Sequence, residues 1–212
     1  RGGGGNPVMS AISESLDCKT LYAEDFHMFR AGVPIVWGVL RNSKTVIDSA
    51  IKHNQYFYYV DHAYFARGHN QNYRISRNGF EAGPVKVCPQ DRFDSLGIQM
   101  KDWNKSGKKI IVCPPTEYFQ NAHNCRSWLD DTLRMIKRYT DRKIVIRDKP
   151  KSGDAIVPLE QQLKEAHALV THSSNVAIES VVLGTPVFVS PTSAAAPVGE
   201  TDLRFIETPK YP

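Results

Sequence analysis

The sequence predicts an α/β fold with a parallel sheet. Short apolar segments rich in Val and Ile alternate along the chain with amphipathic helical segments, and Gly, Pro and Asn separate them. The chain has 212 residues, of which 41% are hydrophobic and 23% charged, so it can form one large domain or two small ones. These values are typical of a globular protein and exclude disorder as a description of the whole chain.

The first half of the chain contains one strand–helix–strand unit. Pro7 opens a short helix, residues 33–40 form an apolar strand, residues 41–54 form an amphipathic helix, and residues 56–61 form a second strand. Residues 62–108 are polar, aromatic and basic and show no sustained period. We expect this long segment to be an excursion of loops outside the sheet, with a short helix or docking loop near its end.

The second half restores the alternation of strands and helices. Gly184 is predicted to close the last helix. We place a domain boundary near residue 107, which gives an acceptor-side half over 1–107 and a donor-side half over 108–212. Strands are predicted at 108–115, 143–150, 167–173 and 185–191, and helices at 121–140, 158–166 and 175–184.

Charge and cysteine content favour a cytoplasmic protein with an anionic partner. There are 27 Lys and Arg against 22 Asp and Glu, which gives a net charge of +5 and a pI of about 9.0. The four cysteines have spacings of neither a zinc site nor a disulfide scaffold, so we expect reduced thiols. No apolar run reaches about 18 residues and no secretory pattern opens the chain, although it begins with Arg1 and a segment could have been removed upstream.

The turn that follows the strand ending at His172 is the most informative motif. Ser173, Ser174 and Asn175 open a helix, and the free N–H groups of a first helical turn can hold a phosphate. Glu179 lies about one turn further along, where a carboxylate can accept hydrogen bonds from a ribose diol. The alternative is that the three polar residues only cap the helix and that Glu179 is solvated.

Together with the later Gly-Thr-Pro-Val at 184–187, this motif resembles the donor-binding region of GT-B nucleotide-sugar glycosyltransferases over about residues 108–199. The chain lacks a Glu-x7-Glu pattern. The resemblance implies two Rossmann-like halves facing a cleft, with the N-terminal half reduced and interrupted by a long loop region. It also implies that Ser173, Ser174 and Asn175 bind the donor diphosphate and that Glu179 binds the ribose. We count His172, at the end of the preceding strand, among the donor-binding residues.

The strand over 143–150 ends in two basic residues. Arg147 and Lys149 alternate along it and can point to one side of the sheet's carboxyl edge, where guanidinium and ammonium groups suit phosphate oxygens. In the family they would meet the donor diphosphate. The alternative is a solvated strand end.

Asp61 and His62 end a strand at the edge where α/β sheets bind ligands. A transferase needs a base for the attacking hydroxyl, and we expect Asp61, or else His62, to serve. Equally, Asp61 could cap the next turn and His62 could pack. Neither a metal nor another cofactor is required in this interpretation, and no DxD motif stands out.

The loop excursion interleaves basic and aromatic residues in a pattern that suits nucleic acid. The segments YVDHAYF and YRISRNG resemble phage-type enzymes that glucosylate hydroxymethylated DNA bases. That resemblance implies UDP-glucose as donor, a hydroxymethylated pyrimidine of double-stranded DNA as acceptor, flipped out of the duplex, and the host cytoplasm as location. The acceptor or DNA contacts would be Arg67, His69, Tyr73, Arg74 and Arg77.

Several alternatives stay open at this stage. The basic segment could instead close over the diphosphate, and the acceptor could be a surface or capsular glycan. The chain could also be a non-catalytic nucleotide- or DNA-binding module. The glycine-rich stretch at 1–6 could cradle a phosphate or could be a linker.

Overall fold

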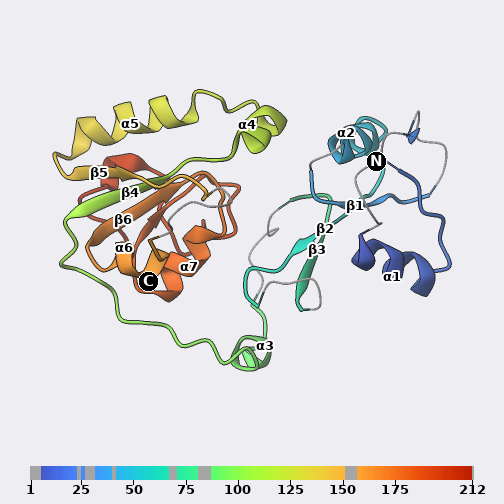
Figure 1. The fold of residues 1–212 in the computed structure, drawn as a ribbon, viewed down its shortest axis with the longest axis horizontal. Helices are drawn as coiled ribbons and strands as arrows, with labels where there is room; N and C mark the ends of the chain where they lie inside the picture. The colour runs from blue at the N-terminus through green and yellow to red at the C-terminus, as the bar shows by residue number, and fades with distance from the viewer. Residues whose placement is uncertain are drawn as a thin grey trace. The chain divides into compact units, whose positions relative to one another are not determined.

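The computed structural model describes residues 6–22, 25–26, 32–39, 42–66, 71–80, 87–150 and 157–211. The chain divides into two compact units, Arg1–Gly83 and Pro84–Pro212, which are described separately (Figure 1). Within the described ranges, no helix has the length and apolar character needed to cross a lipid bilayer.

The first unit is built on a three-stranded sheet with the order β1-β2-β3. Strands β1 and β2 are parallel, and β2 and β3 are antiparallel. The elements are α1 (Pro7–Ser15), β1 (Ile35–Trp37), α2 (Ser43–Lys52), β2 (Tyr58–His62) and β3 (Tyr73–Arg77). The predicted strand–helix–strand unit is therefore confirmed, and the described part of this unit holds one such crossover.

Helix α2 covers one face of this sheet. Ile47 and Ala50 of α2 are fully buried and pack with Val36 of β1, Tyr59 of β2 and the neighbouring Phe57. These side chains come from one face of the strands because residues alternate between the two faces of a sheet. The helix thus fixes which strand residues are left on the opposite face.

The prediction of loops throughout residues 62–108 is wrong at β3. Residues Tyr73–Arg77 pair with β2 in antiparallel register, with His62 opposite Tyr73 and Tyr58 opposite Arg77. The strand is at the edge of the sheet and only Tyr73 and Ile75 give it apolar character, so its sequence resembles that of a polar loop. A single turn of helix, α3 (Asp91–Asp94), follows later in the same segment.

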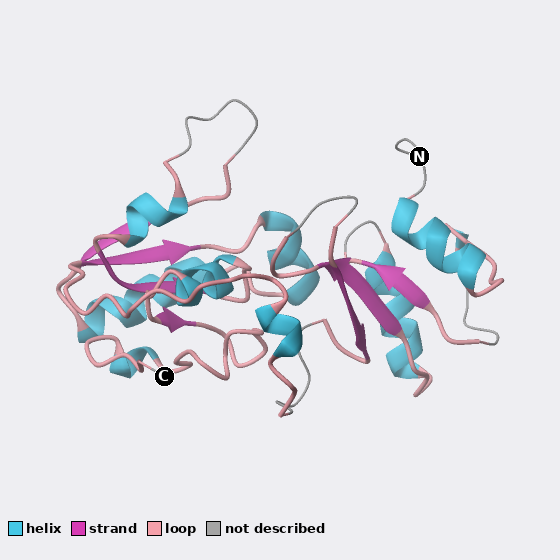
Figure 2. Cartoon of the chain, turned by 90° about the horizontal axis from the view of Figure 1, so that it is seen from below, coloured by secondary structure: helices cyan, strands magenta, loops and turns pink. Residues whose placement is uncertain are grey.

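The second unit contains a four-stranded, fully parallel sheet with the order β5-β4-β6-β7. The sequence predicts the parallel arrangement, and strands are drawn in magenta in Figure 2. Helices alternate with the strands along the chain. Besides α3, the elements are β4 (Lys109–Cys113), α4 (Glu117–His123), α5 (Trp128–Tyr139), β5 (Lys143–Ile146), α6 (Leu159–Leu163), β6 (Ala166–Thr171), α7 (Val176–Val182), β7 (Val187–Phe188) and the 3-10 helix η2 (Leu203–Phe205).

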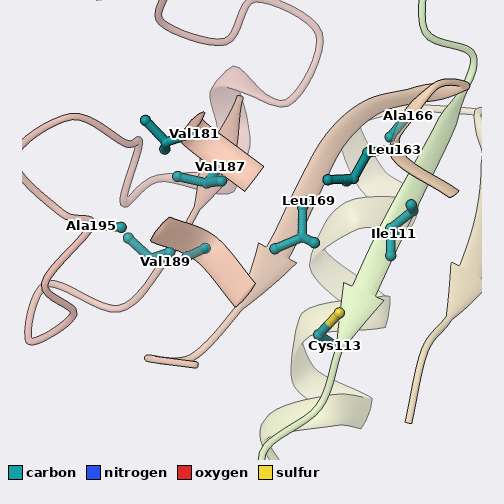
Figure 3. Close-up of a cluster of buried hydrophobic side chains, with 10 residues drawn as sticks. Ile111, Cys113, Leu163, Ala166, Leu169, Val181, Val187, Val189 and Ala195 are labelled. Carbon is teal, nitrogen blue, oxygen red and sulfur yellow. The ribbon is translucent and has the colours of Figure 1, made fainter. Parts of the chain in front are cut away.

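Both faces of this sheet are covered. On one face, Ile110 and Val112 of β4 pack with Ile136 of α5. On the other face, Ile111 of β4 and Leu169 of β6 pack against α6 and α7, as Figure 3 shows for this second cluster. A sheet buried on both faces requires continuous apolar strands, which is why β4 and β6 are the most recognisable elements in the sequence.

The helix predicted over 121–140 is two helices. Asn124 has a left-handed φ of 52° and ends α4, and α5 begins only at Trp128. Helix α4 also begins earlier than predicted, because the Thr116 hydroxyl accepts a hydrogen bond from the N–H of Phe119 at 3.4 Å and caps it. Phe119 and His123 therefore lie on a separate helix after β4.

The units divide at residues 83 and 84, whereas the sequence places the boundary near 107. The difference arises because the segment before β4 docks on the second unit. The N–H of Lys101 donates to the carbonyl of Val182 at 2.9 Å, and the N–H of Asn104 donates to the carbonyl of Gly184 at 2.7 Å. The predicted docking loop is confirmed.

Candidate functional site

The carboxyl ends of the parallel strands in the second unit meet at one edge of the sheet, which we call the carboxyl edge. Backbone hydrogen bonds connect neighbouring strands at this edge. The N–H of Arg147 donates to the carbonyl of Val112 at 2.8 Å, and the N–H of Ser190 donates to the carbonyl of His172 at 2.8 Å. Parallel α/β sheets bind ligands at this edge. The structure therefore places the predicted donor residues at one edge: Arg147, Lys149, His172, Ser173, Ser174 and Asn175.

The polar turn after β6 leads into α7 as predicted. The Ser174 carbonyl accepts the N–H of Ala177 at 3.0 Å, and its hydroxyl lies 3.5 Å from the N–H of Val176, so Ser174 caps the turn. Glu179 lies in the middle of this seven-residue helix, and its N–H donates to the Asn175 carbonyl at 3.2 Å. Its side chain is part-exposed.

Helix α6 and the residue Val157 that precedes it hold the Arg147 side chain. The Nη1 group donates to the carbonyl of Val157 at 2.9 Å and to Oε1 of Gln162 at 2.8 Å. Both acceptors are neutral, so these contacts orient the guanidinium without compensating its charge. Lys149 is exposed two residues further along.

An aromatic–histidine cluster lies beside the polar turn and was missed in the sequence. The His172 ring approaches Phe119 of α4 at 5.1 Å between ring centroids and Trp128 of α5 at 6.3 Å, while Phe119 stacks on His123 at 4.0 Å. Residues 119 and 123 are spaced by one helical turn, but this signal has meaning only once α4 is known to begin at Glu117.

The same cluster determines the charge of His172. Burial, and then the neighbouring His123, lower the pKa of His172 below its ordinary value. The Nδ1 atom lies 3.2 Å from the Ser173 hydroxyl. The lowered pKa favours the neutral, hydrogen-bonding form of the His172 ring at the carboxyl edge.

In the first unit, Asp61 and His62 end β2 as predicted. One carboxylate oxygen of Asp61 accepts a hydrogen bond from the Tyr59 hydroxyl at 2.7 Å and lies 3.4 Å from Nη2 of Arg74. The other oxygen accepts the N–H of His62 at 2.8 Å. Asp61 is thus held by three donors.

The predicted acceptor residues that the structure describes, Tyr73, Arg74 and Arg77, lie on two faces of β3. Tyr73 and Arg77 share one face of β3, while Arg74 is on the other face, where its Nη1 donates to the Tyr64 hydroxyl at 2.6 Å and to the Phe80 carbonyl at 2.9 Å. Arg67 and His69 lie outside the described residues, as does the glycine-rich stretch 1–5.

Metal ligands are not grouped in the part of the chain that the structure describes, where no three His, Cys, Asp or Glu side chains come together as a metal site requires. The candidate donor site contains hydroxyl, imidazole, guanidinium, ammonium and carboxylate groups from the ends of β5 and β6 and from α7.

Comparison with known proteins gives little. No protein-family model matches the chain, and no curated protein matches its sequence. Among solved structures, Thermosulfurimonas dismutans KpsC, a beta Kdo 2,4 transferase, is similar with a TM-score of 0.46 and 9% sequence identity, over 76% of this chain and 70% of that chain. Family membership does not follow from these comparisons.

Proposed function

We propose that the chain is a glycosyltransferase that moves a sugar from a nucleotide sugar to a hydroxyl acceptor. The observation that carries the proposal is the grouping of Arg147 and Lys149 with the 172–175 turn at one carboxyl edge, with Glu179 on the helix that follows. Basic groups suit a diphosphate and a carboxylate suits a ribose diol. UDP-glucose is the donor that we expect.

Arg147 would stabilise the leaving diphosphate. Negative charge develops on the bridging oxygen as the sugar departs, and a cation already held in place stabilises it without reorganisation. The neutral partners of Arg147, Val157 and Gln162, provide that orientation. Lys149 would add a second charge, and the neutral His172 a hydrogen bond.

For the acceptor, we propose a hydroxymethylated pyrimidine in DNA. The hydroxyl group must lose its proton as it attacks the sugar, and Asp61 is the proposed base, with His62 as the substitute. Asp61 is positioned for such a role by Tyr59 and Arg74. Removing a general base costs about 10²–10⁴-fold in rate, so Asp61→Asn should lose turnover and retain donor affinity.

Nucleotide binding is tested by calorimetric titration with UDP. Glu179→Ala should weaken binding by about 1.5–3 kcal/mol, because it removes a charge-assisted contact to the ribose. The matched control is Glu117→Ala, which removes an exposed glutamate from the first turn of α4. An unchanged dissociation constant for Glu179→Ala would refute its assignment.

The acceptor is tested by offering the protein three substrates with UDP-glucose: hydroxymethylated duplex DNA, unmodified duplex DNA and a surface oligosaccharide. Mass spectrometry of each should show a hexose only on hydroxymethylated DNA. Transfer to the oligosaccharide instead would assign the glycan acceptor. Nucleotide binding with neither transfer nor donor hydrolysis would assign a binding module.

A further inference from the structure

The face of the β1-β2-β3 sheet opposite α2 is rich in aromatic side chains. Side chains of residues that pair across neighbouring strands lie on the same face of a sheet. Trp37 of β1 pairs with Val60 of β2, while Tyr58 and His62 of β2 pair with Arg77 and Tyr73 of β3, so all three strands contribute to this face. We call it the aromatic face and define it by six residues: Trp37, Tyr58, His62, Tyr73, Ile75 and Arg77.

Three of these rings touch. The Trp37 and His62 centroids are 5.1 Å apart, those of Trp37 and Tyr73 are 5.8 Å apart, and His62 stacks on Tyr73 at 5.7 Å. All three rings are part-exposed. Beside them, 37% of Tyr58 and 62% of Ile75 are exposed, whereas Val60, between Tyr58 and His62 on β2, is fully buried, so the accessible part of this face is formed by the side chains around Val60.

The charge on this face is one-sided. None of its six residues is acidic, whereas Asp61, on the opposite face, is paired with Arg74. Arg77 is exposed, and its guanidinium lies 5.2 Å from the ring centroid of Tyr56, which extends the aromatic and cationic surface beyond the strand. Such a surface complements a chain of anionic groups that carries planar rings.

We propose that the aromatic face binds an unpaired nucleic-acid strand. Bases would stack on the exposed parts of the Trp37, His62 and Tyr73 rings, and Arg77 would meet a phosphate. The strand must be unpaired because the faces of bases in a duplex are already stacked. This inference rests on the proposed function for its acceptor and deepens it: the face would hold the unpaired nucleotides that flank the reacting base, while Asp61 lies on the opposite face at the end of β2, and Arg74 would take no part.

The proposal is tested with the full chain and no donor, by fluorescence anisotropy of a fluorescein-labelled twelve-nucleotide oligothymidine and of its duplex with oligoadenine. The single strand should bind more tightly than the duplex. Tyr73→Ala should weaken single-strand binding about tenfold or more, whereas Tyr73→Phe, which keeps the ring, should not. Tyr118→Ala removes an exposed tyrosine of the second unit and is the matched control.

Ile75→Glu covers the case in which Tyr73→Ala does not fold. Its side chain is exposed, so the substitution should leave the fold intact while placing a carboxylate on the aromatic face and abolishing single-strand binding. Arg77→Gln should reduce the salt dependence of binding by about one released counterion. Full binding by Ile75→Glu, or duplex bound as tightly as single strand, would overturn the proposal.

The same samples are titrated with UDP. If UDP binds and oligothymidine does not, the aromatic-face proposal is wrong and the donor proposal stands. If oligothymidine binds and UDP does not, the proposed glycosyltransferase is wrong and the nucleic-acid face stands. Failure of oligothymidine with capture of an acidic oligosaccharide would assign the face to a glycan and overturn the inference.

Discussion

Gly184→Ala tests how the segment before β4 is held against the sheet that carries the candidate donor site. Gly184 has a left-handed φ of 76°, and a Cβ added there would lie 2.1 Å from the carbonyl oxygen of Asp102. That oxygen belongs to the backbone and cannot rotate away like a side chain. The substitution must therefore displace the docked segment as well as strain the turn.

The expected loss of stability follows from these two effects. A non-glycine residue in the left-handed region costs roughly 1–2 kcal/mol. Displacing the segment also breaks the backbone hydrogen bonds from Lys101 to Val182 and from Asn104 to Gly184, each of which contributes about 1 kcal/mol. The free energy of unfolding should therefore fall by roughly 3–4 kcal/mol.

Urea denaturation followed by circular dichroism measures this loss. Gly97→Ala is the matched control, because Gly97 has a φ of 62° but an added Cβ would meet no atom within 4 Å. It should lose only the conformational part of the stability, roughly 1–2 kcal/mol. Equal losses in the two variants would show that the approach of Asp102 does not require glycine at position 184.

Three further outcomes are expected. Iodoacetamide at pH 8 should alkylate the exposed Cys18 and leave Cys113 unmodified until the protein unfolds, because burial raises the pKa of Cys113 to about 12; mass spectrometry reports the sites. Contacts from Arg142 lower the pKa of Glu207. The free energy of unfolding should therefore decline as pH falls below the ordinary glutamate pKa of about 4.3. Arg142→Gln should flatten that decline, as measured by urea titrations. Thr171→Val should cost about 1 kcal/mol in the same titrations, because the buried hydroxyl of Thr171 donates to the Cys113 carbonyl at 2.7 Å.

The strands of the second unit could be predicted from the sequence because each buried strand is recognisable from its own run of apolar residues. The apolar runs 110–112 and 168–170 are buried on both sides of the sheet, and such strands have a distinct sequence. The break after α4 could not be predicted, since Asn124 can take either a helical or a left-handed conformation and the neighbouring sequence remains helical in character. The edge strand β3 was missed because three of its five residues, Arg74, Ser76 and Arg77, are polar and it lacks the apolar character of a buried strand.

For the candidate site, the sequence predicts where residues lie along the strands but not which side chains they contact. The sequence places Arg147 and His172 at strand ends, and parallel topology then brings them to one edge. It does not reveal that Gln162 orients Arg147 or that Phe119 shields His172, because these contacts join segments far apart in the chain.

Asp61 and Arg74 show why such partners affect the functional interpretation. They are 13 residues apart and are brought together only by the antiparallel register of β2 and β3, which pairs them directly. Sequence reasoning assigns Arg74 to phosphate and Asp61 to catalysis, yet the two side chains contact each other on the face opposite His62 and Tyr73. A phosphate drawn to Arg74 would compete with Asp61 for the same guanidinium. Under the proposed nucleic-acid binding, strand alternation favours Tyr73 and Arg77, rather than Arg74, as the contacts from β3, and it leaves Arg74 to position the carboxylate of Asp61.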